Sequence, residues 1–180
     1  LFFLTALNIM RVRGKFVLID FDSSMSFKEN RYAGFKCSPG FIPPELVHVD
    51  SAGPLIKAYT EDFFGQPLTE GLPYSLVLAR PSYDMWSLGV TLFQLCAAVP
   101  LFLMDINDSI DDDSLLLLAA WTDTFKLSKL ATVPDIMTRN FLAQLLNKRE
   151  DRRSEGQASR AYGIGSNDRP NMLFRRLRRQ

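Results

Sequence analysis

Two oxygen-bearing side chains near the amino end of the sequence, Asn8 and Asp20, could together hold a divalent metal ion. Mg²⁺ prefers hard oxygen ligands such as carboxylates and amide carbonyls, and it keeps several waters or phosphate oxygens around it. In phosphoryl transfer such an ion neutralises charge between phosphates. The plainer interpretation is that Asn8 is a turn residue before a strand and that Asp20 caps the end of a strand.

Other metal chemistry has few candidate ligands in this sequence. Cys37 and Cys96 are the only cysteines, they lie far apart, and His48 is the only histidine. A zinc-type cluster needs about four nitrogen and sulfur ligands at close spacing, so we do not expect one. Two reduced, packed thiols are typical of a cytoplasmic or nuclear protein, and we expect that location.

The residues between Asn8 and Asp20 predict a small β-hairpin. Residues 9–12 and 16–19 are β-prone, and Gly14 between them can take the positive φ of a tight turn. Residues 22–44 show no sustained period and are rich in Ser, Gly and Pro, which indicates a loop. Residues 47–81 contain four prolines and three glycines, and we expect a long surface insertion there.

Helices are expected from Tyr83 onward. Residues 84–98 are apolar on nearly every face, which is typical of a helix at the centre of a domain. A second helix is expected after the acids at 111–113, and a third is expected to begin near Pro134. Residues 85–104 are free of charge over twenty positions and have to be weighed as a membrane span, but Gln94 and Pro100 favour a buried helix instead.

Five segments in this order resemble landmarks of the protein kinase family, over roughly residues 7–154. They are Leu7-Asn8-Ile9, Asp20-Phe21-Asp22, Pro43-Pro44-Glu45, Asp84-Met85-Trp86-Ser87-Leu88-Gly89, and Leu145-Leu146 followed by Arg153. They are similar to the end of the catalytic loop, the metal-binding DFG motif, the APE motif, the start of the central helix and the closing LLxxDPxxR pattern. The resemblance implies a mostly α (α+β) fold, a C-terminal kinase lobe with one small β-hairpin and a helical bundle.

The resemblance also implies roles for single residues. Asp20 would chelate the Mg²⁺ that bridges the β- and γ-phosphates of ATP, and Asn8 would hold a second Mg²⁺. Ser38 would lie in the loop that contacts the substrate, and its small hydroxyl favours the Ser/Thr branch. Glu45 and Arg153 would form a buried ion pair, and Asp84 would cap the amino end of its helix.

Three departures from the family weaken the expectation of catalysis by this chain alone. Phe3 stands where the family has its catalytic acid, and phenylalanine cannot accept a proton from a substrate hydroxyl. No glycine-rich loop or phosphate-binding lysine precedes the match, and Asp22 replaces the glycine of the DFG motif. Without those groups, binding of ATP and Mg²⁺ by this chain alone is in doubt.

The sequence divides into a kinase-like region at 1–154 and a basic tail at 155–180. Residues 148–180 contain ten Lys or Arg and four Asp or Glu, a net charge of +6. We expect the tail to be disordered; the alternative is that it binds acidic lipid, nucleic acid or an acidic protein surface. The partner we expect for the protein is a protein substrate or binding protein, with no nucleic acid and no membrane.

Three functions therefore stay open after the sequence analysis. The first is a fragment of a Ser/Thr protein kinase domain, which transfers phosphate from ATP in the complete protein. The second is a non-catalytic pseudokinase that serves as a protein-interaction scaffold. The third is a membrane-anchored protein that spans the bilayer with residues 85–104.

Overall fold

The computed structural model describes residues 5–21, 24, 29–107 and 109–148, which form a mixed α/β arrangement. Its helices are α1 (Pro81–Ala97), α2 (Asp112–Ala119), α3 (Asp123–Leu130) and α4 (Ile136–Leu145). Its strands form three separate antiparallel pairs, β1 (Ile9–Val12) with β2 (Lys15–Leu18), β3 (Val47–Asp50) with β4 (Gly53–Ile56), and β5 (Thr60–Glu61) with β6 (Pro67–Leu68). Three short 3₁₀ helices are η1 (Ala6–Asn8), η3 (Pro39–Phe41) and η4 (Pro44–Leu46).

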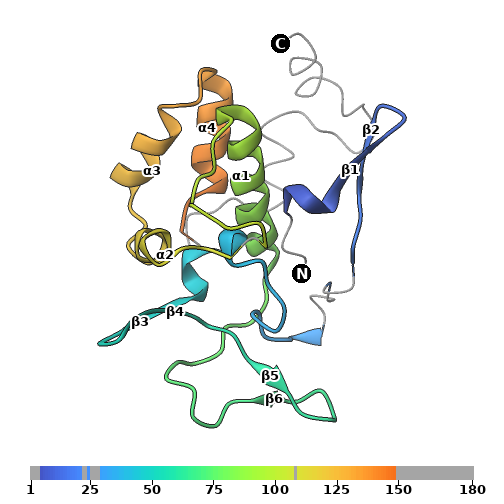
Figure 1. The fold of residues 1–180 in the computed structure, drawn as a ribbon, viewed down its shortest axis with the longest axis vertical. Helices are drawn as coiled ribbons and strands as arrows, with labels where there is room; N and C mark the ends of the chain where they lie inside the picture. Colours follow the sequence, from blue (N-terminus) through green and yellow to red (C-terminus); the bar gives the residue numbers. More distant parts are fainter. Residues whose placement is uncertain (1–4, 22–23, 25–28, 108, 149–180) are drawn as a thin grey trace.

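Helices α1 and α4 lie side by side at the centre of the described part, and α3 packs on α4 (Figure 1). Helix α2 contacts β3, β4 and η4, while η3 contacts α1. The β1–β2 hairpin lies on the far side of α1 from α3, and the β5–β6 pair projects away from the helices (Figure 1). The helices thus form one packed unit with the strand pairs at its edges.

Helix α1 is the central helix that the sequence predicts, but it begins earlier than expected. Its first residue is Pro81 and its N-cap is Arg80; its last residue is Ala97, and the C-cap Ala98 is left-handed with φ of 56°. Asp84 therefore lies in the first turn and is not the N-cap residue, so that prediction was wrong. Pro81 has no backbone N–H to donate, which suits the first helical position and lets the helix start there. None of the helices in the described ranges is long and apolar enough to cross a membrane.

The three shorter helices begin at side-chain caps. The carboxylates of Asp111 and Asp135 accept from the backbone N–H groups of Ser114 and Thr138, and the hydroxyl of Thr122 accepts from the N–H of Phe125. Helix α4 begins near Pro134, as expected, but Asp135 is its cap, so Pro134 precedes the helix and does not occupy its first position. Helix α3 was not expected, since its eight residues carry two lysines among a few apolar positions.

The core is centred on two tryptophans. Trp86 of α1 and Trp121, just after α2, are both buried, and their rings meet edge to face with centroids 5.3 Å apart. The indole N–H of Trp121 donates to the carbonyl of Leu146, at the end of α4, over 2.8 Å. Through these two contacts Trp121 joins α1, the end of α2 and the end of α4.

The β-structure exceeds the single hairpin that was expected. The predicted hairpin is present as β1–β2, and its turn has positive φ at both Arg13 and Gly14. The region at 47–81, interpreted as a surface insertion, contains β3 to β6, and Val47 and Tyr59 within it are buried. Part of that region therefore belongs to the packed unit. Its prolines obscured the strands, because proline is unusual in the interior of a strand.

Candidate functional site

The base of the β1–β2 hairpin brings the two predicted metal ligands to the same end. The backbone N–H of Ile19 donates to the carbonyl of Asn8 over 2.9 Å, one step beyond the paired residues Ile9 and Leu18. Asp20 follows Ile19 directly. Asn8 in turn donates its N–H to the carbonyl of Thr5, a buried residue, over 3.2 Å. The hairpin therefore fixes the backbone of both candidate ligands relative to each other.

Asp20 has an uncommon backbone conformation. Its φ is 63°, in the left-handed region that most side chains avoid, although Asp and Asn adopt it more readily than others. Such residues cost about 1–3 kcal/mol and gather at active sites and ligand clamps. In Asp20 this conformation occurs at the predicted metal-binding position, directly after a strand, which makes the function hypothesis worth testing.

The donors at this site fit Mg²⁺ bound together with phosphates better than a metal held by protein alone. Asn8 is half-buried and Asp20 is exposed, and they offer one amide and one carboxylate. In the described part of the chain, no group of three or more His, Cys, Asp and Glu side chains could hold a metal ion. Mg²⁺ commonly takes one or two carboxylates and completes its shell with substrate phosphates and water, so the fit depends on a nucleotide.

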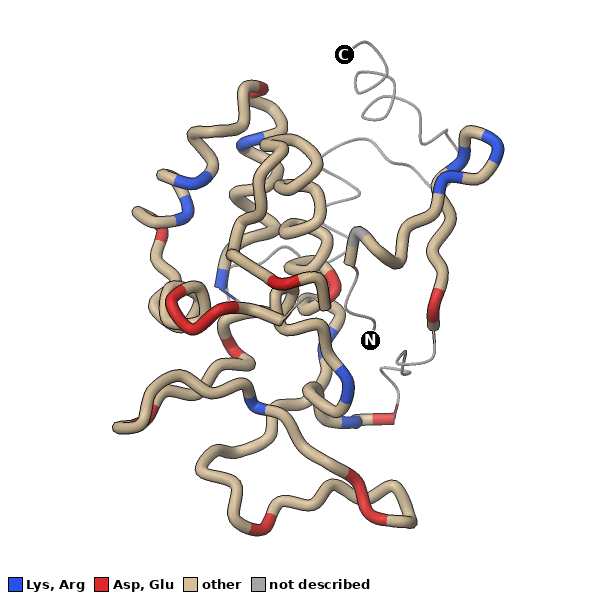
Figure 2. Tube along the Cα trace, in the orientation of Figure 1, with Lys and Arg blue, Asp and Glu red and all other residues tan. Residues whose placement is uncertain are grey.

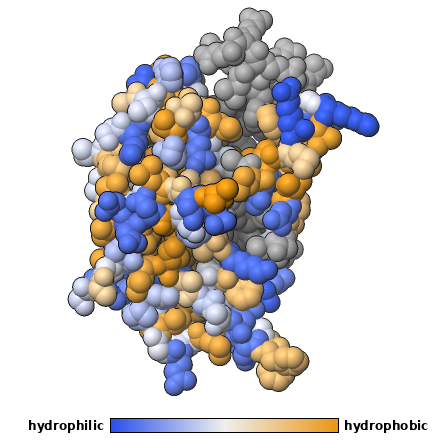
Figure 3. Space-filling view, viewed as in Figure 1, coloured by the Kyte–Doolittle hydropathy of each residue, from blue (hydrophilic) through white to orange (hydrophobic). Residues whose placement is uncertain are grey.

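The hairpin that carries these residues also exposes apolar side chains. Exposed fractions are 66% for Leu7, 48% for Met10, 57% for Phe16 and 56% for Phe21. Figure 3 shows apolar surface on the hairpin, to the right of the helices. Exposed apolar side chains gathered on one element mark an interaction site on many proteins. The candidate metal site is therefore next to a surface suited to a further protein element.

The remaining predicted site residues lie elsewhere. Ser38 is the half-buried N-cap residue of η3, and its carbonyl accepts from the N–H of Phe41 over 2.9 Å. Glu45 lies in η4, where its backbone carbonyl accepts from the Lys57 ammonium over 3.1 Å. Phe3, at the general-base position, and Arg153, the predicted partner of Glu45, lie outside the described residues, so neither prediction is tested.

The central and carboxyl-terminal landmark segments converge in the core. The Ser87 hydroxyl, fully buried in α1, donates to the carbonyl of Phe41 over 2.9 Å. Gly89 faces the end of α4, where a Cβ on it would lie 3.0 Å from atoms of both Leu145 and Leu146. The segment at 41–46, the start of α1 and the end of α4 are thus held against one another.

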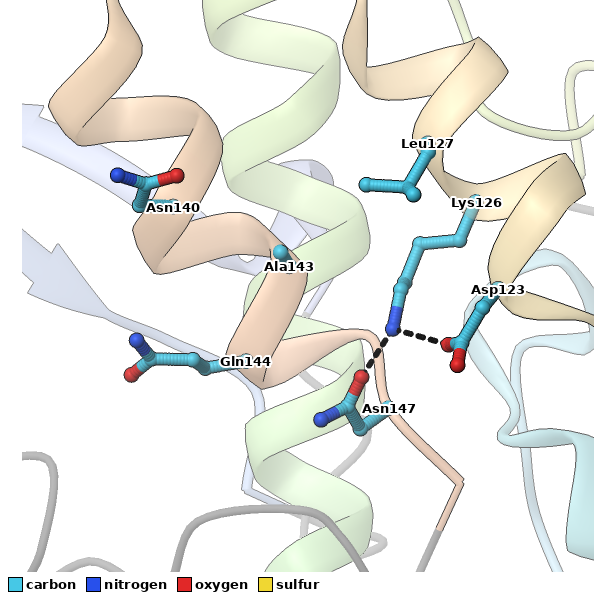
Figure 4. Close-up of a pocket in the computed structure, with 7 residues that line it drawn as sticks. All are labelled: Asp123, Lys126, Leu127, Asn140, Ala143, Gln144 and Asn147. Carbon is cyan, nitrogen blue, oxygen red and sulfur yellow. Dashed lines mark hydrogen bonds and ion pairs between the residues drawn. The ribbon is translucent and has the colours of Figure 1, made fainter.

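A second polar site, between α3 and α4, was missed from the sequence. It is an open pocket of about 700 Å³ lined by Asp123, Lys126, Leu127, Asn140, Ala143, Gln144 and Asn147 (Figure 4). Lys126 is only 5% exposed, and its ammonium donates to Asp123 over 2.7 Å and also to the Asn147 side chain. Its hydrogen bond and positive charge lower the pKa of Asp123. The spacing of Asp123 and Lys126 on one helix could have indicated this pair.

The two thiols show no sign of reactivity. Burial raises the pKa of Cys37 to about 11, and burial together with the negative charge of Asp135 raises the pKa of Cys96. Reactive cysteines need a lowered pKa, so both thiols are packing residues.

Comparison with known proteins adds no identification. A scan against protein-family models, a search of curated proteins and a search of solved structures each returned no match to this chain.

Proposed function

We propose that this chain forms the C-terminal lobe of a protein kinase-type domain. Within a domain that also supplies an amino-terminal lobe and a catalytic acid, it would hold the metal ion and the protein substrate during phosphoryl transfer from ATP to Ser or Thr. The observation that carries the proposal is Asp20, left-handed at φ of 63° and fixed beside Asn8 by the Ile19 hydrogen bond.

The packing of the other landmarks supports the same proposal. The resemblance requires the segment at 43–45, the helix starting near Asp84 and the closing Leu145-Leu146 pair to belong to one lobe. The Ser87 contact with Phe41 and the packing of Gly89 on Leu145 and Leu146 satisfy that requirement.

The chain's own residues would act by binding and orientation. Asp20 and Asn8 would hold Mg²⁺, which supplies charge neutralisation at the phosphates of ATP. Asp20 lies at an exposed position directly after the hairpin, where a nucleotide could approach it. Ser38, whose backbone is fixed by the η3 turn, would lie in the segment that receives the substrate. None of the described residues is assigned the role of general base.

The proposal is tested by isolating the natural protein and measuring its intact mass, its amino-terminal sequence and its ATP-dependent phosphorylation of Ser- and Thr-containing peptides. An antibody should be raised against residues 60–71, which are largely exposed, because the landmark at 84–89 is half-buried to buried and inaccessible in the folded protein. We expect a mass well above 20.4 kDa and phosphoryl transfer that requires Mg²⁺. A protein of 20.4 kDa with no such activity would contradict the proposal.

The second candidate function is a non-catalytic scaffold. The observation that favours it is the apolar surface of the β1–β2 hairpin, which could bind a partner protein with no nucleotide present. A natural protein that fails to bind ATP with Mg²⁺, but still forms a complex that Phe16→Ser disrupts, would support the scaffold. Loss of both binding and catalysis on changing Asp20 would support the kinase.

A further inference from the structure

The tip of the β5–β6 pair displays two adjacent aromatic side chains to solvent. Phe63 is 96% exposed and Phe64 is 81% exposed, and their rings meet edge to face with centroids 5.5 Å apart. A phenylalanine side chain offers a large apolar area, and aromatic side chains are enriched at protein interfaces. Two of them together on a projecting turn are therefore a candidate binding surface, which we call the aromatic tip.

The aromatic tip is built on a well-defined turn. The Asp62 carboxylate accepts from the backbone N–H groups of Phe64 and Gln66, each over 2.8 Å, and the N–H of Asp62 donates to the carbonyl of Gln66 over 2.9 Å. Gly65 has φ of 74°, which glycine adopts without strain. The backbone is thus already ordered before binding, which lowers the entropic cost of forming an interface.

The surroundings of the aromatic tip are acidic. Residues 60–79 contain three acidic side chains, Glu61, Asp62 and Glu70, and no Lys, Arg or His. Figure 2 shows only acidic positions along this stretch. Phosphates of nucleic acid and anionic lipid headgroups would be repelled by it, whereas a segment with arginines between apolar side chains would be attracted.

One segment of this chain has that composition. Residues 173–179 read Leu-Phe-Arg-Arg-Leu-Arg-Arg, with four arginines and no acid. Arginine guanidinium groups are attracted to the faces of aromatic rings, and leucine and phenylalanine can cover the exposed rings of Phe63 and Phe64. The charges and the apolar groups of the two segments are therefore complementary.

The chain between the helices and this segment is long enough to reach. Residues 149–172 could extend to about 80 Å at the usual rise per residue, and a domain of this size has a radius of gyration of about 15 Å. A tether of this length gives an effective concentration of about millimolar, so binding within one molecule is favoured over binding between molecules at micromolar protein.

We propose that residues 173–179 bind the aromatic tip of the same molecule, with Phe63 and Phe64 as the apolar contacts and the acidic charge of residues 60–79 as the source of the electrostatic attraction. This inference does not depend on the kinase proposal, because it uses neither the β1–β2 hairpin nor the metal ligands.

The test is the rate at which trypsin cleaves the full chain after Arg175 to Arg179, followed by mass spectrometry. Cleavage requires the tail to leave its binding surface, so its rate follows the unbound fraction. The double variant Phe63→Ser/Phe64→Ser should be cleaved at least about threefold faster than the parent. Glu70→Lys, at an exposed position outside the turn's hydrogen bonds, should give a smaller acceleration.

A matched control exists on a second turn of the same design. Asp105 accepts from the N–H groups of Asn107 and Ser109, and the next residue, Ile106, is 91% exposed. Ile106→Ser removes one exposed apolar side chain from that turn and should leave the cleavage rate unchanged. A synthetic peptide of residues 170–180, cleaved under the same conditions, gives the rate for an unbound tail.

Three results would overturn the proposal. Equal tail cleavage in the parent and the double variant, with both folded by circular dichroism, removes the aromatic tip as the binding surface. An equal acceleration by Ile106→Ser would show that the effect is not specific to Phe63 and Phe64. Protection that disappears on tenfold dilution, with a dimer seen by sedimentation, would place the contact between molecules. Glu70→Lys gives an independent test if the double variant does not fold.

Discussion

The helical core and the β1–β2 hairpin represent two different degrees of packing in one chain. In the core, Trp86, Trp121 and Leu142 are at most 2% exposed, and side chains from three distant segments meet. In the hairpin, Phe16 and Val17 are 57% and 42% exposed. The core buries its apolar side chains, whereas the hairpin that carries the candidate metal ligands leaves apolar side chains exposed.

This difference indicates that the residues that stabilise the fold and the residues of the candidate site lie in different regions. Burying apolar surface stabilises by roughly 25 cal/mol per Å², so the core supplies the stability of the described part. Among the described residues, the hairpin is joined by its own backbone hydrogen bonds and by the link between Asn8 and Ile19. A functional site on such an element can be completed by another protein element that covers the apolar side chains.

The largest effect is expected at Trp121. Trp121→Ala removes a buried ring that contacts Trp86 and leaves the Leu146 carbonyl without its indole donor. The free energy of unfolding should fall by about 3–5 kcal/mol. Urea unfolding followed by circular dichroism measures it. Leu95→Ala, at a 57% exposed position on α1, is the control, and an equal loss in both would contradict the packing described for the core.

Two glycine substitutions compare the core with the hairpin directly. Gly34 has φ of 104°, and a Cβ there would lie 2.2 Å from the carbonyl oxygen of Lys57, so Gly34→Ala should cost about 3 kcal/mol. Gly14, with φ of 77°, has open space around it. Gly14→Ala strains only the hairpin turn and should lower the stability of the core by less than about 1 kcal/mol. Similar melting temperatures for the two variants would show that the hairpin and the core unfold as one unit.

A smaller effect is expected where α1 meets the segment at 39–46. Ser87→Ala leaves the buried carbonyl of Phe41 without the hydroxyl that donates to it and should cost about 1–2 kcal/mol. Ser128→Ala, whose exposed hydroxyl donates to the carbonyl of Phe125 in α3, should change stability by less than about 0.5 kcal/mol. Thermal melting of both variants gives the comparison. Equal values would mean that the Ser87 contact does not hold these segments together.

The smallest effect is expected at the α3–α4 pocket and depends on pH. The Lys126 ammonium lowers the pKa of Asp123 in the folded state below the value near 3.9 of an unfolded chain. The contribution to stability is therefore present above about pH 4 and is lost as the pH falls through the lowered pKa. Asp123→Asn should melt below the parent at pH 7, and the difference should shrink as the pH falls below about 4. A difference in melting temperature that stays constant across this pH range would show that the charge of Asp123 does not contribute to stability.

Much of the fold was predictable from local sequence signals. The Gly14 turn indicated the β1–β2 hairpin, the acids at 111–113 indicated the start of α2, and the continuous apolar run near Trp86 indicated a central helix. Each of these signals acts within a few residues of the element that it specifies. The positions of Asn8 and Asp20 at one end of the hairpin followed from the same turn.

The features that were missed depend on contacts between distant residues or on short, mixed sequences. From the sequence, Lys126 would be expected to be exposed. In the structure it is buried, and its ammonium donates to Asn147, twenty-one positions further along the chain. The start of α1 at Pro81 moved Asp84 out of the cap position, because proline can begin a helix that periodicity alone places later. The strands between residues 47 and 68 are short and contain Pro54 and Pro67, so no alternating pattern marked them.

The most direct test of the kinase proposal compares Asp20→Asn with Asp50→Asn in the natural protein. Asp50 is also an exposed aspartate at the end of a hairpin strand, where it accepts from the N–H of Ala52 over 2.7 Å. We predict that Asp20→Asn lowers Mg²⁺-dependent phosphoryl transfer at least about 100-fold, with the melting temperature unchanged, and that Asp50→Asn keeps full activity. Equal activity in the two variants would contradict the assignment of Asp20 as the metal ligand and, with it, the proposed function.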